Sequence, residues 1–231
     1  MRDVLTWFLV LELLGLIGVP LVRRVFAALP SRGYAFAKPL ALLLLGYSFW
    51  LLGILQFLAN STGAIVFILL CLAAVSATIA WRDRVELRRY WLEQRAAIVA
   101  SEITFLVFFG LWCIYRAYNP DLNYTEKPMD LLFLNSLMRS PALPPNDPWL
   151  SGFAISYYYF GYLLVSLIAR LSGVVASVGF NLALASIMGL AASGAYSIGY
   201  DLIALKERLF RPGIAIQPPN LRLLLFPVLP A

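Results

Sequence analysis

Runs of about 20 apolar residues constrain the fold of this 231-residue chain more than any other feature. A helix rises about 1.5 Å per residue, so about 20 apolar residues cross the ~30 Å hydrocarbon core of a bilayer. Only 13% of the residues are charged, about half the share found in soluble domains. The strict alternation that a transmembrane barrel requires does not occur. The sequence therefore predicts an all-α integral membrane protein, a polytopic bundle of about six to seven transmembrane helices with one long outward loop bearing short interfacial helices.

The apolar runs define the expected organisation of the chain. An arginine-rich connection, 82–95, is expected to lie as a helix at the membrane interface. We expect an N-terminal three-span region (1–95), a core (96–205), and a polar connection leading into the start of a truncated span (206–231). Since the last run has no polar flank, we expect a fragment of a longer protein, or one that needs a further membrane subunit to supply missing spans. The expected spans are 4–22, 35–58, 63–81, 96–115, 156–171 and 178–205, with another run beginning near 221.

Lysine and arginine are distributed unevenly among the connections between these spans. The first and third connections hold nine of them, if Lys38 at the start of the second span is counted with the first connection, and the second connection holds none. Cytoplasmic loops are enriched in Lys and Arg, which predicts a multi-pass protein of the plasma membrane with its N-terminus and residues 116–155 outside. Simple alternation then places Lys206, Arg208 and Arg211 outside too, against the rule. Either the protein tolerates these charges there, or residues 174–205 contain a break.

Residues 116–162 form a polar island in this apolar chain. Six of the 14 prolines and four of the 12 acidic residues lie between Ala117 and Ile155. Loops of this length are usually functional or disordered. The chain contains no histidine, so acid–base chemistry would depend on carboxylates, Lys or Tyr. The net charge of +6 is expected to reflect membrane topology and anionic lipids rather than a nucleic-acid partner.

Two acidic residues in this island flank the start of an expected helix. Pro128 suits the first turn of a helix, where a missing N–H costs nothing. Glu126 and Asp130 then gather at the positive N-terminus. They are candidate catalytic groups, or they merely cap the helix. Asp147 precedes a proline and Trp149 follows it, which favours a turn with Trp149 anchored at the headgroups.

Three consecutive tyrosines, Tyr157, Tyr158 and Tyr159, follow the island. They either form an aromatic belt at the membrane interface or direct some hydroxyls into a groove, where these need partners. Glu102 lies inside an expected span, where an ionisable group indicates a functional site. An ion pair with Arg170 or Arg116 is the structural alternative.

The combined pattern resembles the YYY membrane proteins of Chloroflexi and archaea, a family grouped with the GT-C membrane glycosyltransferases. The resemblance rests on Glu126–Asp130 (EKPMD), Pro144–Trp149 (PPNDPW), Ser151–Gly152 (SG), Tyr157–Gly161 (YYYFG) and Phe180–Ala183 (FNLA).

This resemblance implies a transferase that takes a sugar from a polyprenyl-phosphate-linked donor at the outer face of a lipid membrane. It implies that Glu126 is catalytic, supported by Asp130, and that a divalent cation such as Mg or Mn binds at these two residues if a metal is used. Lys127 or Arg116 would meet the donor phosphate. The other implied substrate-binding residues are Asp147, Trp149, Tyr157, Tyr158 and Tyr159.

Two alternatives come from other classes of protein. The chain could be a non-catalytic membrane subunit or scaffold whose outward loop docks a partner. It could also be a transporter, because Glu12, Glu102 and Asp201 lie inside expected spans. Transporters usually carry paired repeats with interrupted helices, and the sequence shows no such pairing.

Overall fold

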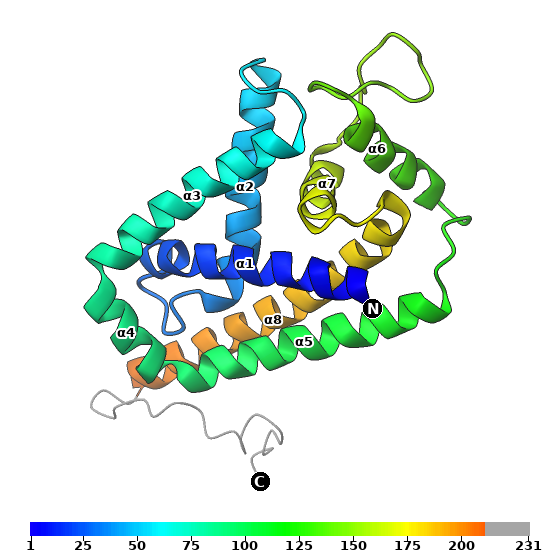
Figure 1. The fold of residues 1–231 in the computed structure, drawn as a ribbon. Coiled ribbons are helices and arrows are strands. Elements are labelled where there is room, and N and C mark those ends of the chain that lie inside the picture. The colour runs from blue at the N-terminus through cyan, green and yellow to red at the C-terminus, as the bar shows by residue number, and fades with distance from the viewer. Residues whose placement is uncertain (211–231) are drawn as a thin grey trace.

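The computed structural model describes residues 1–210 and shows a helical membrane protein (Figure 1). The described part contains no named strand, only an isolated bridge between Asn146 and Ala154. The predicted fold class is thereby confirmed. By length and composition, five helices can cross a membrane: α1 (Arg2–Val25), α2 (Ala37–Ile54) with the preceding 3₁₀ turn η1 (Tyr34–Phe36), α3 (Thr62–Arg82), α5 (Arg95–Tyr118) and α8 (Ala176–Phe210).

Three shorter helices connect these spans. Helix α4 (Arg84–Glu93) follows α3 and occupies the segment predicted to be interfacial. Helix α6 (Lys127–Arg139) begins where the sequence predicts it, with Pro128 in its first turn. Helix α7 (Phe160–Ser172) ends at Gly173, which adopts the left-handed conformation with φ of 71°. Glycine takes this conformation without steric cost, which ends the helix and turns the chain toward α8.

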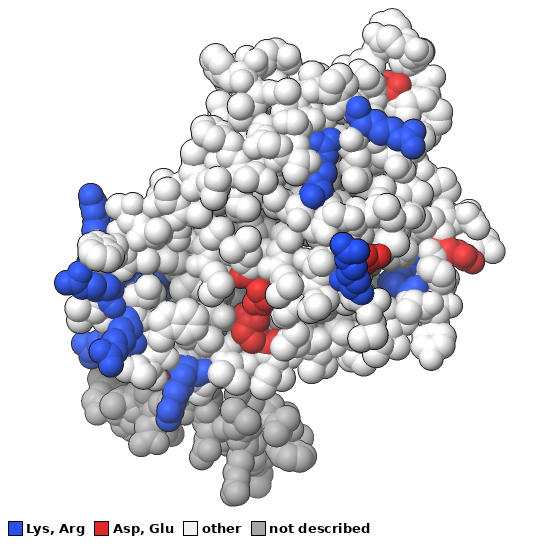
Figure 2. Space-filling view, in the orientation of Figure 1, with Lys and Arg blue, Asp and Glu red and all other residues white. Residues whose placement is uncertain are grey.

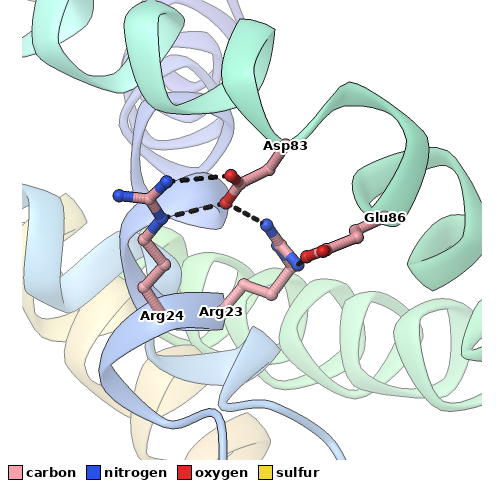
Figure 3. A network of polar contacts seen from close by, with 4 residues as sticks. All are labelled: Arg23, Arg24, Asp83 and Glu86. Carbon is pink, nitrogen blue, oxygen red and sulfur yellow. Dashed lines mark hydrogen bonds and ion pairs between the residues drawn. The ribbon is translucent and has the colours of Figure 1, made fainter.

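A network of ion pairs holds together one end of the bundle, which we call the basic end because Arg23, Arg24 and α4 lie there (Figure 3). Arg24 binds Asp83 through two hydrogen bonds of 2.8 and 2.9 Å. Arg23, only 4% exposed, binds the same carboxylate and also Glu86 at 3.1 Å. These contacts join the end of α1 to the corner between α3 and α4. Blue side chains gather over α4 in Figure 2.

Helix α7 does not cross the membrane, although the sequence predicts a span over 156–171. Its 13 residues are about 20 Å long, short of the ~30 Å that a span requires. Both of its ends lie at the end of the bundle opposite the basic end, which we call the loop end. Tyr159 at its start accepts a hydrogen bond from Trp50, near the end of α2. Arg170 near its other end donates to the carbonyl of Asn60, between α2 and α3.

Because α7 stays at the loop end, α8 runs from the loop end to the basic end. Asp201, near the end of α8, accepts two hydrogen bonds of 2.7 Å from Ser31, in the connection after α1. Lys206 therefore lies at the same end as Arg23 and Arg24. The conflict between simple alternation and the positive-inside rule disappears for this residue. A break in 174–205 was one of the two alternatives, and the structure shows none after the start of α8 at Ala176, since the helix is continuous from there. Arg211 and the apolar run near 221 lie outside the described residues.

Four apolar clusters form the core of the described residues, and two of them position α7 at the loop end. Leu163 and Leu167 of α7 pack against Leu45 and Phe49 of α2. Trp7 of α1 is fully buried between α5 and α8, and its indole N–H donates to Ser186 Oγ at 2.8 Å. Fixed aromatic and leucine side chains thus hold α7 across the bundle and support α6 above it.

Candidate functional site

The start of α6 brings two carboxylates to the loop end. Glu126 is the N-cap residue, but its side chain makes no capping hydrogen bond and is exposed. Asp130, one turn later, accepts a hydrogen bond from the hydroxyl of Tyr162 on α7. The interpretation that both residues merely cap the helix therefore lacks the expected contact at Glu126. This leaves the Glu126 carboxylate free to act on a ligand.

The tyrosines lie beside these carboxylates. Tyr157 donates a hydrogen bond to the hydroxyl of Tyr158 at 2.6 Å, and its ring stacks on Phe133 of α6 with 5.2 Å between centroids. The hydrogen bond with Tyr158 raises the pKa of Tyr157 to about 12, and the negative charges of Glu126 and Asp130 add to the shift. With its pKa raised, this hydroxyl remains a neutral hydrogen-bond donor at physiological pH.

An aromatic groove of about 400 Å³ adjoins the tyrosines. Trp50 of α2 donates to the hydroxyl of Tyr159 at 3.0 Å, which fixes one wall. Sequence reasoning missed the contribution of α2, because nothing in the chain indicates that residues about 110 positions apart meet. An aromatic near the end of a span is the one signal that could have suggested it. The groove is lined by Tyr47, Trp50, Tyr157, Tyr158, Tyr159 and Phe160.

Of the two predicted phosphate-binding cations, the structure leaves Lys127 the more accessible. Arg116 is only 5% exposed, and its Nε donates to Asn181 Oδ1 at 2.6 Å. It also donates to the carbonyl of Asp121 at 3.3 Å, which ties the chain after α5 to α8. Lys127 lies next to Glu126 and makes only a long contact of 3.5 Å to the same carbonyl. Arg116 therefore supports the loop, and Lys127 is the cation that could reach a ligand.

Asp147 and Trp149 have structural contacts. Asp147 Oδ1 accepts hydrogen bonds from the backbone N–H groups of Trp149 and Leu150, at 2.8 and 2.9 Å. This is the turn that the sequence suggests as the alternative to substrate binding. Trp149 packs edge-on against Phe133, with 5.5 Å between ring centroids. Both residues shape the segment that covers α6.

Glu102 belongs to a different place in the molecule. Its carboxylate pairs with Lys38 of α2 at 2.6 Å, and not with Arg170 or Arg116 as the sequence suggests. Lys38 also contacts Glu12 of α1 at 3.2 Å. Glu102 precedes Arg116 by 14 residues on α5, about 21 Å along the helix axis, so it takes no part in the site at the loop end. Sequence reasoning missed Lys38, which it counted as a loop cation.

The described residues include no group of three or more His, Cys, Asp or Glu side chains that could hold a metal ion. At the loop end, Glu126 and Asp130 offer two carboxylates, and Asp130 already accepts a hydrogen bond from Tyr162. Mg²⁺ can bind through one or two carboxylates only when a substrate supplies further oxygens. The residues present do not make a protein-held metal site, and no step proposed below depends on one.

Arg170 connects the elements that support this site. Its guanidinium donates to Asn60 O at 3.0 Å and to Leu137 O and Met138 O at 2.9 Å each. The last two are carbonyls at the end of α6, where a cation is favourable. One side chain thus joins α7 to α6 and to the connection between α2 and α3.

We expect Arg170→Met to lower the free energy of unfolding by about 2 kcal/mol, because buried carbonyls lose a charged donor. Chemical unfolding in mixed micelles measures this change. Arg139→Met is the matched control, since Arg139 is exposed in the last turn of α6, and it should change stability by less than about 0.5 kcal/mol. Equal losses of unfolding free energy in the two variants would contradict the conclusion that the Arg170 hydrogen bonds stabilise the loop end.

The chain as a whole can be compared with known proteins. No curated protein and no solved structure matches the chain. A family of uncharacterized membrane proteins, DUF2298, matches residues 44–225, from α2 through the end of the described chain. The matched region includes α6, the tyrosines and both walls of the aromatic groove. The chain belongs to this membrane protein family.

Proposed function

We propose that this protein is a membrane glycosyltransferase that uses a polyprenyl-phosphate-linked sugar at the loop end. The observation that carries the proposal is the Glu126 carboxylate. It sits at a helix start without capping the helix, one turn before Asp130. The resemblance of the EKPMD and YYYFG segments to the YYY proteins, and through them to the GT-C glycosyltransferases, supports the same assignment.

In the proposed reaction Glu126 accepts the proton of an acceptor hydroxyl. The acceptor oxygen forms a bond to the anomeric carbon of the sugar. The bond between that carbon and the phosphate oxygen breaks, and the polyprenyl phosphate leaves with the electron pair. Asp130, held by Tyr162, orients the acceptor. A carboxylate serves as the base in a chain that lacks histidine.

The neighbouring surfaces suit the two parts of such a donor. Lys127 provides a cation next to Glu126 for the phosphate. The aromatic groove offers apolar rings for a prenyl chain or a sugar face. Tyr157 lines this groove and also stacks on Phe133 of α6, so we expect a ligand in the groove to extend toward the start of α6, where Glu126 lies.

The orientation in the membrane is also part of the proposal. The positive-inside rule favours the basic end in the cytoplasm and the loop end outside. In a plasma membrane, the reaction would then take place on the outer face. A thiol-specific, membrane-impermeant reagent applied to intact cells would label a cysteine introduced at exposed Asn123, but not one at exposed Arg88.

Glu126→Gln tests the catalytic assignment. We expect at least a 100-fold loss of sugar transfer from a polyprenyl-phosphate-linked donor in proteoliposomes, because a positioned base contributes about 10²–10⁴-fold. The midpoint of thermal unfolding should stay unchanged, since the side chain is exposed and makes no capping bond. Glu93→Gln, an exposed carboxylate at the basic end, is the matched control and should transfer sugar at the wild-type rate. Unchanged transfer by Glu126→Gln would refute the assignment.

A non-catalytic docking role is the second candidate, and one observation favours it. The segment after the turn at Asp147 exposes large apolar side chains outside the spans: Trp149 at 63%, Leu150 at 57% and Phe153 at 62%. Exposed apolar patches often mark interaction surfaces. If the protein is a scaffold, substitution of Trp149 and Phe153 by Ser would abolish partner binding, whereas Glu126→Gln would have no effect.

A further inference from the structure

A groove inside the membrane-spanning part opens between α1 and α5. The two helices meet where Phe8 packs against Phe105 and Phe109, with ring centroids 6.4 and 6.2 Å apart. From there they diverge toward the basic end (Figure 1). Side chains of α1, α2 and α5 line a pocket here, which we call the α1–α5 groove. It contains a cavity of about 30 Å³, lined by Glu12 and Lys38 together with Glu102 and Ser193.

The walls of the groove carry unequal charge. Glu12 projects from α1 and Glu102 from α5, and Lys38 lies between them. Two carboxylates against one ammonium leave a formal charge of −1 when all three groups are ionised. In the described part of the chain, Lys38 is the only cation paired with either carboxylate.

The carboxylates are accessible from the side of the bundle. The side chains of Glu12 and Glu102 are 31% and 27% exposed, whereas that of Lys38 is 7% exposed. Figure 2 shows acidic atoms on an otherwise uncharged surface between α1 and α5. When all three groups are ionised, the uncompensated charge therefore lies at the lateral surface, where acyl chains would otherwise lie.

The depth of these groups makes that exposure costly. Glu102 is seven residues from the start of α5, about 10 Å along the axis. Glu12 is ten residues from the start of α1, about 15 Å along it. A charged side chain near the bilayer centre is unfavourable, and such groups usually pair with one another. A cation from outside the chain would offset this cost.

Both helices that form the groove also expose apolar side chains. Exposed residues on α1 include Leu9, Leu13 and Leu16, and those on α5 include Val99 and Ile103. A second apolar helix could pack against these rims, while Ser193 and Ser101 line the floor and allow close approach.

We propose that the α1–α5 groove binds a transmembrane helix of a different membrane protein that carries one Lys or Arg within its span. That cation pairs with Glu12 and Glu102 and balances the charge around Lys38. A second copy of this chain does not fit as well, because its described spans expose no cation at this depth: Lys38 is buried, and the remaining cations lie near helix ends. The proposal is independent of the glycosyltransferase assignment.

Reconstituted vesicles provide the test. The full chain, labelled with a fluorescence donor, is mixed with an acceptor-labelled leucine-rich transmembrane peptide that carries one Arg at mid-span. We expect saturable energy transfer that is at least tenfold weaker for a matched peptide with Leu in place of Arg. Glu12→Gln and Glu102→Gln should each weaken binding of the Arg peptide at least tenfold. Glu93→Gln, on exposed α4, should bind like the wild type.

Three results would overturn the proposal. The first is equal binding of the Leu and Arg peptides, which is the outcome if a proton already neutralises one carboxylate. The second is unchanged binding by both Gln variants. The third is saturable energy transfer between donor-labelled and acceptor-labelled copies of the full chain that Glu12→Gln abolishes, which would identify a second copy as the occupant. If the Gln variants fail to fold, the wild-type protein is tested with a peptide whose Arg lies two turns closer to the peptide end. The proposal requires that this peptide bind no more tightly than the Leu peptide.

Discussion

Replacing Lys38 with methionine is expected to destabilise the protein by about 3–5 kcal/mol, the usual cost of removing one partner from a buried ion pair. Lys38 Nζ lies 2.6 Å from both oxygens of Glu102 and 3.2 Å from Glu12, and 4.4 Å from the centroid of the Phe105 ring. Without the ammonium, two carboxylates would face each other inside the bilayer. Chemical unfolding in mixed micelles, at constant detergent composition, measures the change.

A triple variant separates this charge effect from lost packing. In Glu12→Gln/Lys38→Met/Glu102→Gln no charge remains, and well-packed neutral groups often replace a buried ion cluster at little cost. We expect the triple variant to recover most of the stability lost in Lys38→Met. A triple variant as unstable as the single one would show that packing, not charge balance, sets the role of Lys38.

Gly18→Ala should have the second-largest effect. A Cβ at residue 18 would lie 2.1 Å from the carbonyl oxygen of Ala37 and 2.6 Å from its carbon. These are backbone atoms at the start of α2, so they cannot move aside as a flexible side chain could. The helices must separate, and we expect a cost at or above the upper end of the ~1–3 kcal/mol seen for overpacked cores.

Gly110→Ala is the control for this substitution. Gly110 also lies within a spanning helix, but a Cβ there meets nothing within 4 Å. Alanine is a better helix former than glycine, so this variant should be neutral or up to about 1 kcal/mol more stable. The difference between the two midpoints of unfolding isolates the close approach of α1 to α2. Similar stabilities for both variants would contradict the conclusion that close packing of α1 against α2 requires glycine at position 18.

Hydropathy does not predict the position of helix α7 correctly. Its sequence is apolar enough to suggest a span, yet Arg170 lies near its end and bonds carbonyls at the loop end. Hydropathy measures the preference of a segment for an apolar environment, and the surface of a helical bundle offers that environment as well as lipid does. Only the packing of α7 against α2 and α6 shows that this helix lies on the bundle and does not span the lipid.

The candidate site was predicted in part. Proline at the start of a helix and clustered acids indicate Glu126 and Asp130 from local chain chemistry. The structure places Asp130 in contact with Tyr162, whose ring packs on the same Phe133 as that of Tyr157. Tyr162 as the partner of Asp130, and Trp50 as that of Tyr159, could not be predicted. These contacts join helices that are distant in sequence, and no periodicity within one helix specifies them.

By itself the sequence determined that this chain is a helical membrane protein, since long apolar runs have no other stable arrangement in a bilayer. It also determined the polar island and its acidic residues, because prolines and charges at such density exclude a span. The tertiary structure decided which apolar helices cross, and it paired Lys38 with Glu12 and Glu102. Apolar burial is non-directional and leaves the neighbours of each helix open. Close approach at positions such as Gly18, and charge pairing between helices, select one arrangement.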